Sequence, residues 1–134
     1  MPKIRHIALA SDDPEATAAF YRRVFEFEEV GRVGRPDDPE AIAWGVYLSD
    51  GTLNLAVLKF QNVDQLGRGL DFVGLHHFGV LVDDVAASRR RLETEGSRCV
   101  LEAPPGAAFE TKFLGPDGVV FDISEHPWPG TSRE

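Results

Sequence analysis

The sequence predicts an α+β fold in which two βαβββ modules form a curved mixed sheet around a cleft. Residues 6–13 (HIALASDD) and 77–84 (HFGVLVDD) are two copies of one pattern, a largely apolar run led by histidine and closed by an Asp-Asp pair. Each copy is followed by a helix-like stretch and then by strand-like segments joined through an Asp-Gly turn. Such a repeat indicates a duplicated supersecondary unit.

The two modules are expected to share one core, because half of a 134-residue chain could hardly bury a core of its own. We therefore predict a single domain over 1–134. Module one covers about 1–60, a connector 61–73, module two about 74–126, and a tail 127–134.

Module one begins with a strand that starts at His6 and is followed by a helix. Asp13 is a suitable N-cap and Pro14 a suitable first helical residue. The apolar face of this helix is predicted at Ala16, Phe20 and Val24. Strands are expected at 41–48 and 53–60, on either side of the Asp50-Gly51 turn.

Module two repeats this order. Asp84 caps a helix whose inner stripe is predicted at Val85, Ser88 and Leu92, and Gly96 ends it. Three strands then follow at 99–102, 109–114 and 119–124, and the last two are joined by the Asp-Gly turn at 117–118.

The acidic composition limits the partners. Fourteen Lys and Arg against 22 Asp and Glu give a net charge of -8, which argues against nucleic acid and anionic membranes. One cysteine cannot form an internal disulfide, the first residues lack a secretory apolar core, and no apolar run approaches the roughly 18 residues of a membrane span. We therefore expect a cytoplasmic protein.

Strand alternation places several polar side chains on faces where the next residue but one is small. A polar group beside a small one is typical of a cavity wall rather than of a packed core. The pairs are His6 with Ala8, Asn54 with Ala56, His77 with Gly79, and Asp122 with Ser124. By the same alternation His76 is predicted to face the opposite way from His77.

The residues that carry these features resemble the vicinal oxygen chelate superfamily, which includes glyoxalase I, methylmalonyl-CoA epimerase, extradiol dioxygenases and bleomycin-binding proteins. The resemblance rests on 5–9 (RHIAL), 76–80 (HHFGV) and 115–122 (GPDGVVFD). It implies a divalent metal ion, such as Fe, Mn, Co, Ni or Zn, and the ligand positions His6, His77, Asp122 and Asn54. Asp122 and Asn54 are shorter than the Glu and Gln usual there.

Two functions follow from the resemblance. The first is a metal-dependent lyase, isomerase or ring-cleaving dioxygenase acting on a substrate with vicinal oxygens, with Glu110 as a candidate base. The alternative is a metal-free protein that binds or sequesters a small molecule. A homodimer is also expected, because open sheet edges invite pairing and a partner could bury Trp128 and Phe72. The competing interpretation places Trp128 over its own cleft.

Overall fold

The strands of both halves join in one eight-stranded mixed sheet, as the repeat predicts. The computed structural model describes residues 1–62, 64–102 and 110–132. The first half contributes β1 (Lys3–Ala10), α1 (Pro14–Phe25), β2 (Glu28–Val33), β3 (Ala43–Ser49) and β4 (Asn54–Phe60). The predicted strands at 41–48 and 53–60 correspond to β3 and β4, whereas β2 was not located from the sequence.

The second half has the same order of elements. It contributes β5 (Gly74–Leu81), α2 (Val85–Thr94), β6 (Arg98–Leu101), β7 (Thr111–Leu114), a short 3-10 turn (Pro116–Gly118) and β8 (Val120–Ser124). Asp117 and Gly118 have positive φ angles of 63° and 73°, as a tight Asp-Gly turn requires. The start of the strand predicted at 109–114 lies outside the described residues.

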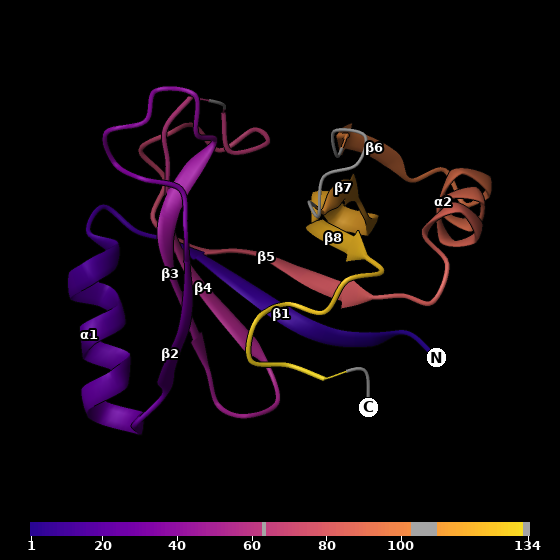
Figure 1. Ribbon diagram of the computed structural model, residues 1–134. Coiled ribbons are helices and arrows are strands. Elements are labelled where there is room, and N and C mark those ends of the chain that lie inside the picture. The colour runs from indigo at the N-terminus through magenta and orange to yellow at the C-terminus, as the bar shows by residue number, and fades with distance from the viewer. Residues whose placement is uncertain (63, 103–109, 133–134) are drawn as a thin grey trace.

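The strands lie in the order β2-β3-β4-β1-β5-β8-β7-β6 across the sheet. The strands of the second half therefore appear in the reverse order of their counterparts in the first half. In each half the first strand pairs in parallel with the last, β1 with β4 and β5 with β8. The halves join through the antiparallel pair of β1 and β5, which lies at the centre of the molecule in Figure 1. The two histidine-bearing strands are therefore direct neighbours.

Both helices pack on the sheet face opposite the predicted polar residues. Val85 and Leu92 of α2 pack against a core of Val82, Phe113 and Ile123. The side chain of Asp84 accepts the amide of Ala87, and Gly96 follows the helix with a φ of 83°, as predicted. Figure 1 shows α1 and α2 on the outer sides of the two halves.

The predicted inner face of α1 was wrong. Ala16 is exposed, and Phe20 and Val24 are 49% and 52% exposed. The helix instead buries Pro14 and Ala18, and half-buries Tyr21. Ala18 packs against valines and leucines of β3 and β4, so a small side chain, not the bulkiest ones, marks the contact with the sheet. Among the described residues no helix is long and apolar enough to cross a membrane.

Candidate metal centre

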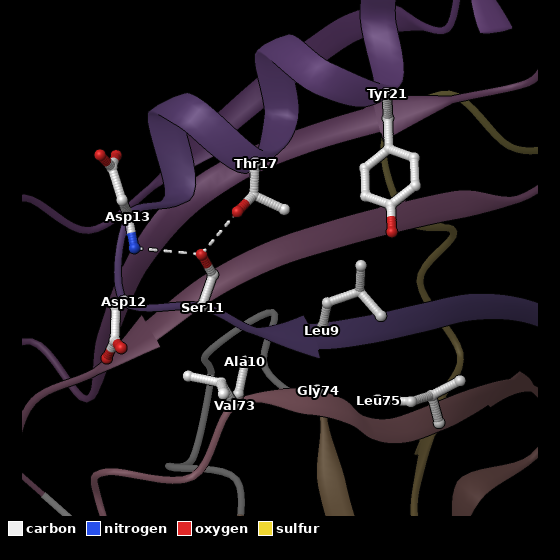
Figure 2. Close-up of a pocket in the computed structure, with 10 residues that line it drawn as sticks. All are labelled: Leu9, Ala10, Ser11, Asp12, Asp13, Thr17, Tyr21, Val73, Gly74 and Leu75. Carbon is white, nitrogen blue, oxygen red and sulfur yellow. Dashed lines mark hydrogen bonds between the residues drawn. The ribbon is translucent and has the colours of Figure 1, made fainter. Parts of the chain in front are cut away.

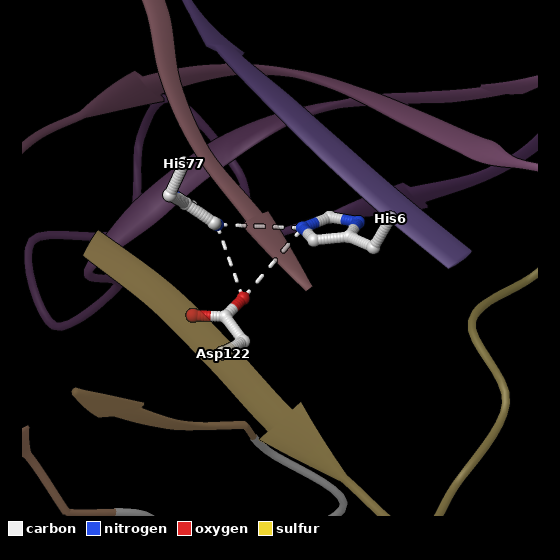
Figure 3. Close-up of side chains that lie close together, drawn as sticks. All are labelled: His6, His77 and Asp122. Atoms are coloured by element: carbon white, nitrogen blue, oxygen red, sulfur yellow. Dashed lines mark hydrogen bonds and ion pairs between the residues drawn. The ribbon is translucent and has the colours of Figure 1, made fainter. Parts of the chain in front are cut away.

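Three buried side chains from three strands meet where the two halves join. His6 comes from β1, His77 from β5 and Asp122 from β8, and each is at most 3% exposed. Figure 3 shows the two imidazoles and the carboxylate pointing toward one another. His77 Nε2 lies 3.1 Å from Asp122 Oδ2, the two Nε2 atoms are 3.4 Å apart, and His6 Nε2 lies 3.7 Å from Asp122 Oδ2. The sequence predicted this group.

The triangle of ligand atoms fits a first-row metal ion. The point in the plane of these three atoms that is equidistant from them lies about 2.0 Å from each, which matches usual metal–nitrogen and metal–oxygen bonds of about 2.0–2.2 Å. Asp122 Oδ2 is buried and has no hydrogen-bond partner among the described residues. Two imidazoles and one carboxylate also form a donor set that first-row ions accept.

Asn54 lies behind His6 rather than among the three ligand atoms. Its Oδ1 is 2.7 Å from Nδ1 of His6, on the side of the ring away from Nε2. Its Nδ2 donates to the carbonyl of Pro129 at 3.0 Å. Both polar atoms of the amide are therefore engaged, and Asn54 orients the ring of His6.

His76 also contacts the group, through His77, contrary to the prediction from strand alternation. Ala8 pairs with His77 while the next residue of β1 pairs with Leu75, so His76 is the extra residue of a β-bulge. The bulge breaks the alternation and brings Nδ1 of His76 within 2.6 Å of Nδ1 of His77. A His77 that donates from Nδ1 to His76 keeps its Nε2 lone pair for a metal.

Lys112 of β7 adds a buried cation beside these side chains. It is 8% exposed and lies opposite Asp122 in the β7–β8 pair. Its Nζ donates to Asp122 Oδ1 at 2.5 Å and lies 3.4 Å from His77 Nε2. One carboxylate oxygen thus holds the ammonium, and the other faces the histidines.

The environment sets the charges of the site. Burial lowers the pKa of His6 to about 4, and burial and Lys112 lower the pKa of His77. Burial alone would raise the pKa of Asp122, but Lys112 and the histidines outweigh it and hold that pKa below its usual range. At neutral pH the site therefore has two neutral imidazoles and one carboxylate, the protonation states that metal binding requires.

The C-terminal tail covers one side of the site. The Trp128 ring stacks on His6 with 4.8 Å between centroids and 4° between planes, and it is only 4% exposed. A Cβ on Gly79 would lie 2.8 Å from that ring, so the missing side chain makes room for it. The expected burial of Trp128 by a partner subunit is wrong, because its own chain buries it. The homodimer itself stays a prediction.

A cleft of about 500 Å³ opens beside His6, His77 and Asp122, which contribute to its lining. Glu110 and Lys112 line it together, and Tyr47 joins them from β3. Figure 2 shows a separate hollow at the start of α1, where Ser11 is hydrogen-bonded to Thr17 and to the amide of Asp13. That hollow brings together no comparable group of ligand atoms among the described residues.

Known proteins share this fold. A hypothetical protein from Bacillus halodurans C-125 has a TM-score of 0.71 at 19% identity, covering 95% of this chain and 96% of that one. Methylmalonyl-CoA epimerase from Mycobacterium tuberculosis has a TM-score of 0.66 at 21% identity, covering 94% and 88%. In sequence, the chain is 29% identical to an ethylmalonyl-CoA/methylmalonyl-CoA epimerase from Cereibacter sphaeroides, over 77% of this chain and 78% of that protein.

The family model of the glyoxalase/bleomycin resistance protein/dioxygenase superfamily matches residues 3–123, which include both helices and every strand except the last residue of β8. The resemblance noted in the sequence is thereby confirmed. This chain belongs to the glyoxalase/bleomycin resistance protein/dioxygenase superfamily.

Proposed function

We propose that the protein is a metal-dependent enzyme that moves a proton on a small oxygen-bearing substrate, in an isomerase-type reaction. The observation that carries the proposal is the convergence of His6 Nε2, His77 Nε2 and Asp122 Oδ2 on one buried point beside the cleft. A divalent ion of Fe, Mn, Co, Ni or Zn would supply Lewis-acid stabilisation of charge on a substrate oxygen. The similarity to an epimerase supports an isomerase over a lyase or dioxygenase.

Glu110 is our candidate for the group that carries the proton. Its carboxylate lines the same cleft as the three ligands, and the indole N–H of Trp128 donates to Oε1 at 2.6 Å. This bond orients the carboxylate so that it can exchange a proton with a bound substrate. Burial, with Glu110 and Asp122 nearby, raises the pKa of Tyr47, which therefore stays a neutral hydrogen-bond donor in the cleft.

Hydrogen–deuterium exchange on a set of candidate substrates tests this function. Cobalt-loaded protein in D₂O is mixed with small hydroxyketones, oxoacids and diketones, and proton NMR follows loss of the hydrogens beside each carbonyl. We expect enhanced exchange with at least one compound. Both Glu110→Gln and His77→Ala should abolish it, whereas Glu95→Gln, at an exposed helix end, should not. Exchange that survives in Glu110→Gln would remove Glu110 from the mechanism.

One observation favours the alternative of a metal-free binding protein. The ammonium of Lys112 already neutralises Asp122 inside the site, so the buried carboxylate is paired without a metal. Such a protein would hold its ligand through the apolar cleft and Tyr47. Ligand binding that is unchanged after treatment with a chelator, together with no proton exchange, would favour this alternative.

A further inference from the structure

We propose that the substrate is a small molecule whose outer end, the end away from the three ligands, is uncharged or cationic, and that it is not a coenzyme A ester. The inference rests on the proposed function in one respect, because it takes His6, His77 and Asp122 as the inner end of the cleft. It follows from the charges and shape of the cleft, and it names a substrate class that differs from that of the epimerases to which the chain is similar.

Carboxylates dominate the charged groups of the cleft. Asp38 and Glu40, from the segment between β2 and β3, line it together with Glu102 and Glu110. Asp122 lies at its inner end, where Lys112 pairs with it. Lys112 is the one lysine or arginine among the described lining residues, and its charge is already matched. The outer part of the cleft therefore has a negative potential that repels anions.

Two arginines beside lining residues, Arg35 and Arg89, do not change this balance. Arg35 follows the lining residue Gly34 and pairs with Asp37 at 3.4 Å. Arg89 pairs with Glu102 through contacts of 2.5 and 2.8 Å. Residues 103–109 (APPGAAF) follow Glu102 in the sequence and contain no charged side chain. Each of these arginines is thus paired with a carboxylate. In the part of the chain that the structure describes, no ion pair joins Asp38, Glu40 or Glu110 to a cation.

The remaining walls are apolar and suit the body of a small molecule. Ile42, Leu58, Phe60 and Leu101 also line the cleft. A volume of about 500 Å³ accommodates a compact aromatic or aliphatic ligand. The nucleotide part of coenzyme A, with its pyrophosphate and 3′-phosphate, would have to extend past Asp38 and Glu40. Recognition of phosphates usually uses arginine, lysine or a helix N-terminus.

The charge preference can be measured by binding alone. Dopamine, catechol and protocatechuate each have two adjacent hydroxyls for the inner end and differ in charge at the outer end. Calorimetry with zinc-loaded protein at low ionic strength should give the tightest binding for dopamine and the weakest for protocatechuate. From dopamine to catechol, and again from catechol to protocatechuate, Kd should rise roughly two- to fivefold. Salt should shrink the differences, because screening shortens the range of exposed charges. Coenzyme A should show no binding.

Variants of the outer carboxylates identify the source of the preference. Asp38→Asn combined with Glu40→Gln should flatten the ranking, and the matched exposed pair Glu26→Gln with Glu95→Gln should leave it unchanged. The inference is overturned if protocatechuate or coenzyme A binds as tightly as dopamine, or if none of the three catechols binds. An intact ranking in a protein that retains no metal would support the inference while refuting the metal-dependent function.

Discussion

Asn54 fixes the tautomer of His6. The Nδ2 of Asn54 donates to the Pro129 carbonyl, so Oδ1 is the atom that faces His6 Nδ1, at 2.7 Å. Because an amide oxygen only accepts, the His6 proton must lie on Nδ1, and Nε2 keeps its lone pair. In metal sites generally, a partner of this kind orients a ligating histidine without touching the metal.

Replacing Asn54 should therefore weaken metal binding without abolishing it. We expect Asn54→Ala to reduce zinc affinity by roughly 10- to 100-fold, the usual effect of losing a partner of a ligating histidine. Competition with a chromophoric chelator measures this, and Asn62→Ala, at an exposed position, is the control. A loss as complete as that of His6→Ala would instead indicate that Asn54 is a direct ligand.

Lys112 should compete with the metal. Its ammonium lies 3.4 Å from His77 Nε2, so a divalent ion would bind beside a positive charge. We expect Lys112→Met to tighten zinc binding by about tenfold or more, and to lower the stability of the metal-free protein because Asp122 loses its partner. Weaker zinc binding in this variant would show that Lys112 serves mainly to orient Asp122.

Trp128 and Gly79 should be energetically coupled. Trp128→Ala removes a buried ring and should cost roughly 3–5 kcal/mol of unfolding free energy. Gly79→Ala should also destabilise the protein, since its Cβ would lie 2.8 Å from that ring. In the Trp128→Ala background the cost of Gly79→Ala should fall, because part of the clash is gone. Strictly additive costs in urea unfolding would mean that the tail does not pack there in solution.

The buried histidines should make the metal-free protein sensitive to acid. The pKa of His6 falls from 6.5 in the unfolded chain to about 4 in the fold, so the folded state binds fewer protons between these values. The stability contributed by a neutral His6 is therefore present above pH 6.5 and is lost as pH falls toward 4, by on the order of 3 kcal/mol.

Urea unfolding across this pH range, compared among variants, isolates the histidine contribution from that of the carboxylates. His6→Gln should show a shallower loss of stability than the wild type. His126→Gln, which alters an exposed histidine, should follow the wild type. Identical pH profiles for all three proteins would contradict the burial of a neutral His6.

The duplicated pattern made most of the fold predictable. Matching histidine-led strands, the caps Asp13 and Asp84 and the Asp-Gly turns each depend on local chemistry that a sequence displays. The strand β2 was not located, because its residues EEVGRV combine charges with a glycine and lack a strand pattern. The inner face of α1 was misjudged because its contact with the sheet uses Ala18, whereas the bulkier Phe20 remains exposed.

The convergence of three side chains was predicted from the sequence, but the residues that surround them were not. Histidines at matching repeat positions and a carboxylate in the last strand identify His6, His77 and Asp122. His76 was misplaced because a bulge interrupts the alternation of β5, and a bulge leaves little trace in a sequence. The pairing of Lys112 with Asp122 was available in principle, since both lie at equal distances from the turn residue Asp117 in the hairpin. The fold-back of Trp128 depends on long-range packing.

The metal content of the purified protein tests the central claim most directly. After equilibration with a divalent ion and removal of loosely bound metal, we expect about one ion for each chain of wild type and of the control His126→Ala. His6→Ala, His77→Ala and Asp122→Ala should each retain little or none, provided that circular dichroism shows them folded. Folded variants whose metal content equals that of the wild type would contradict a metal centre built from His6, His77 and Asp122.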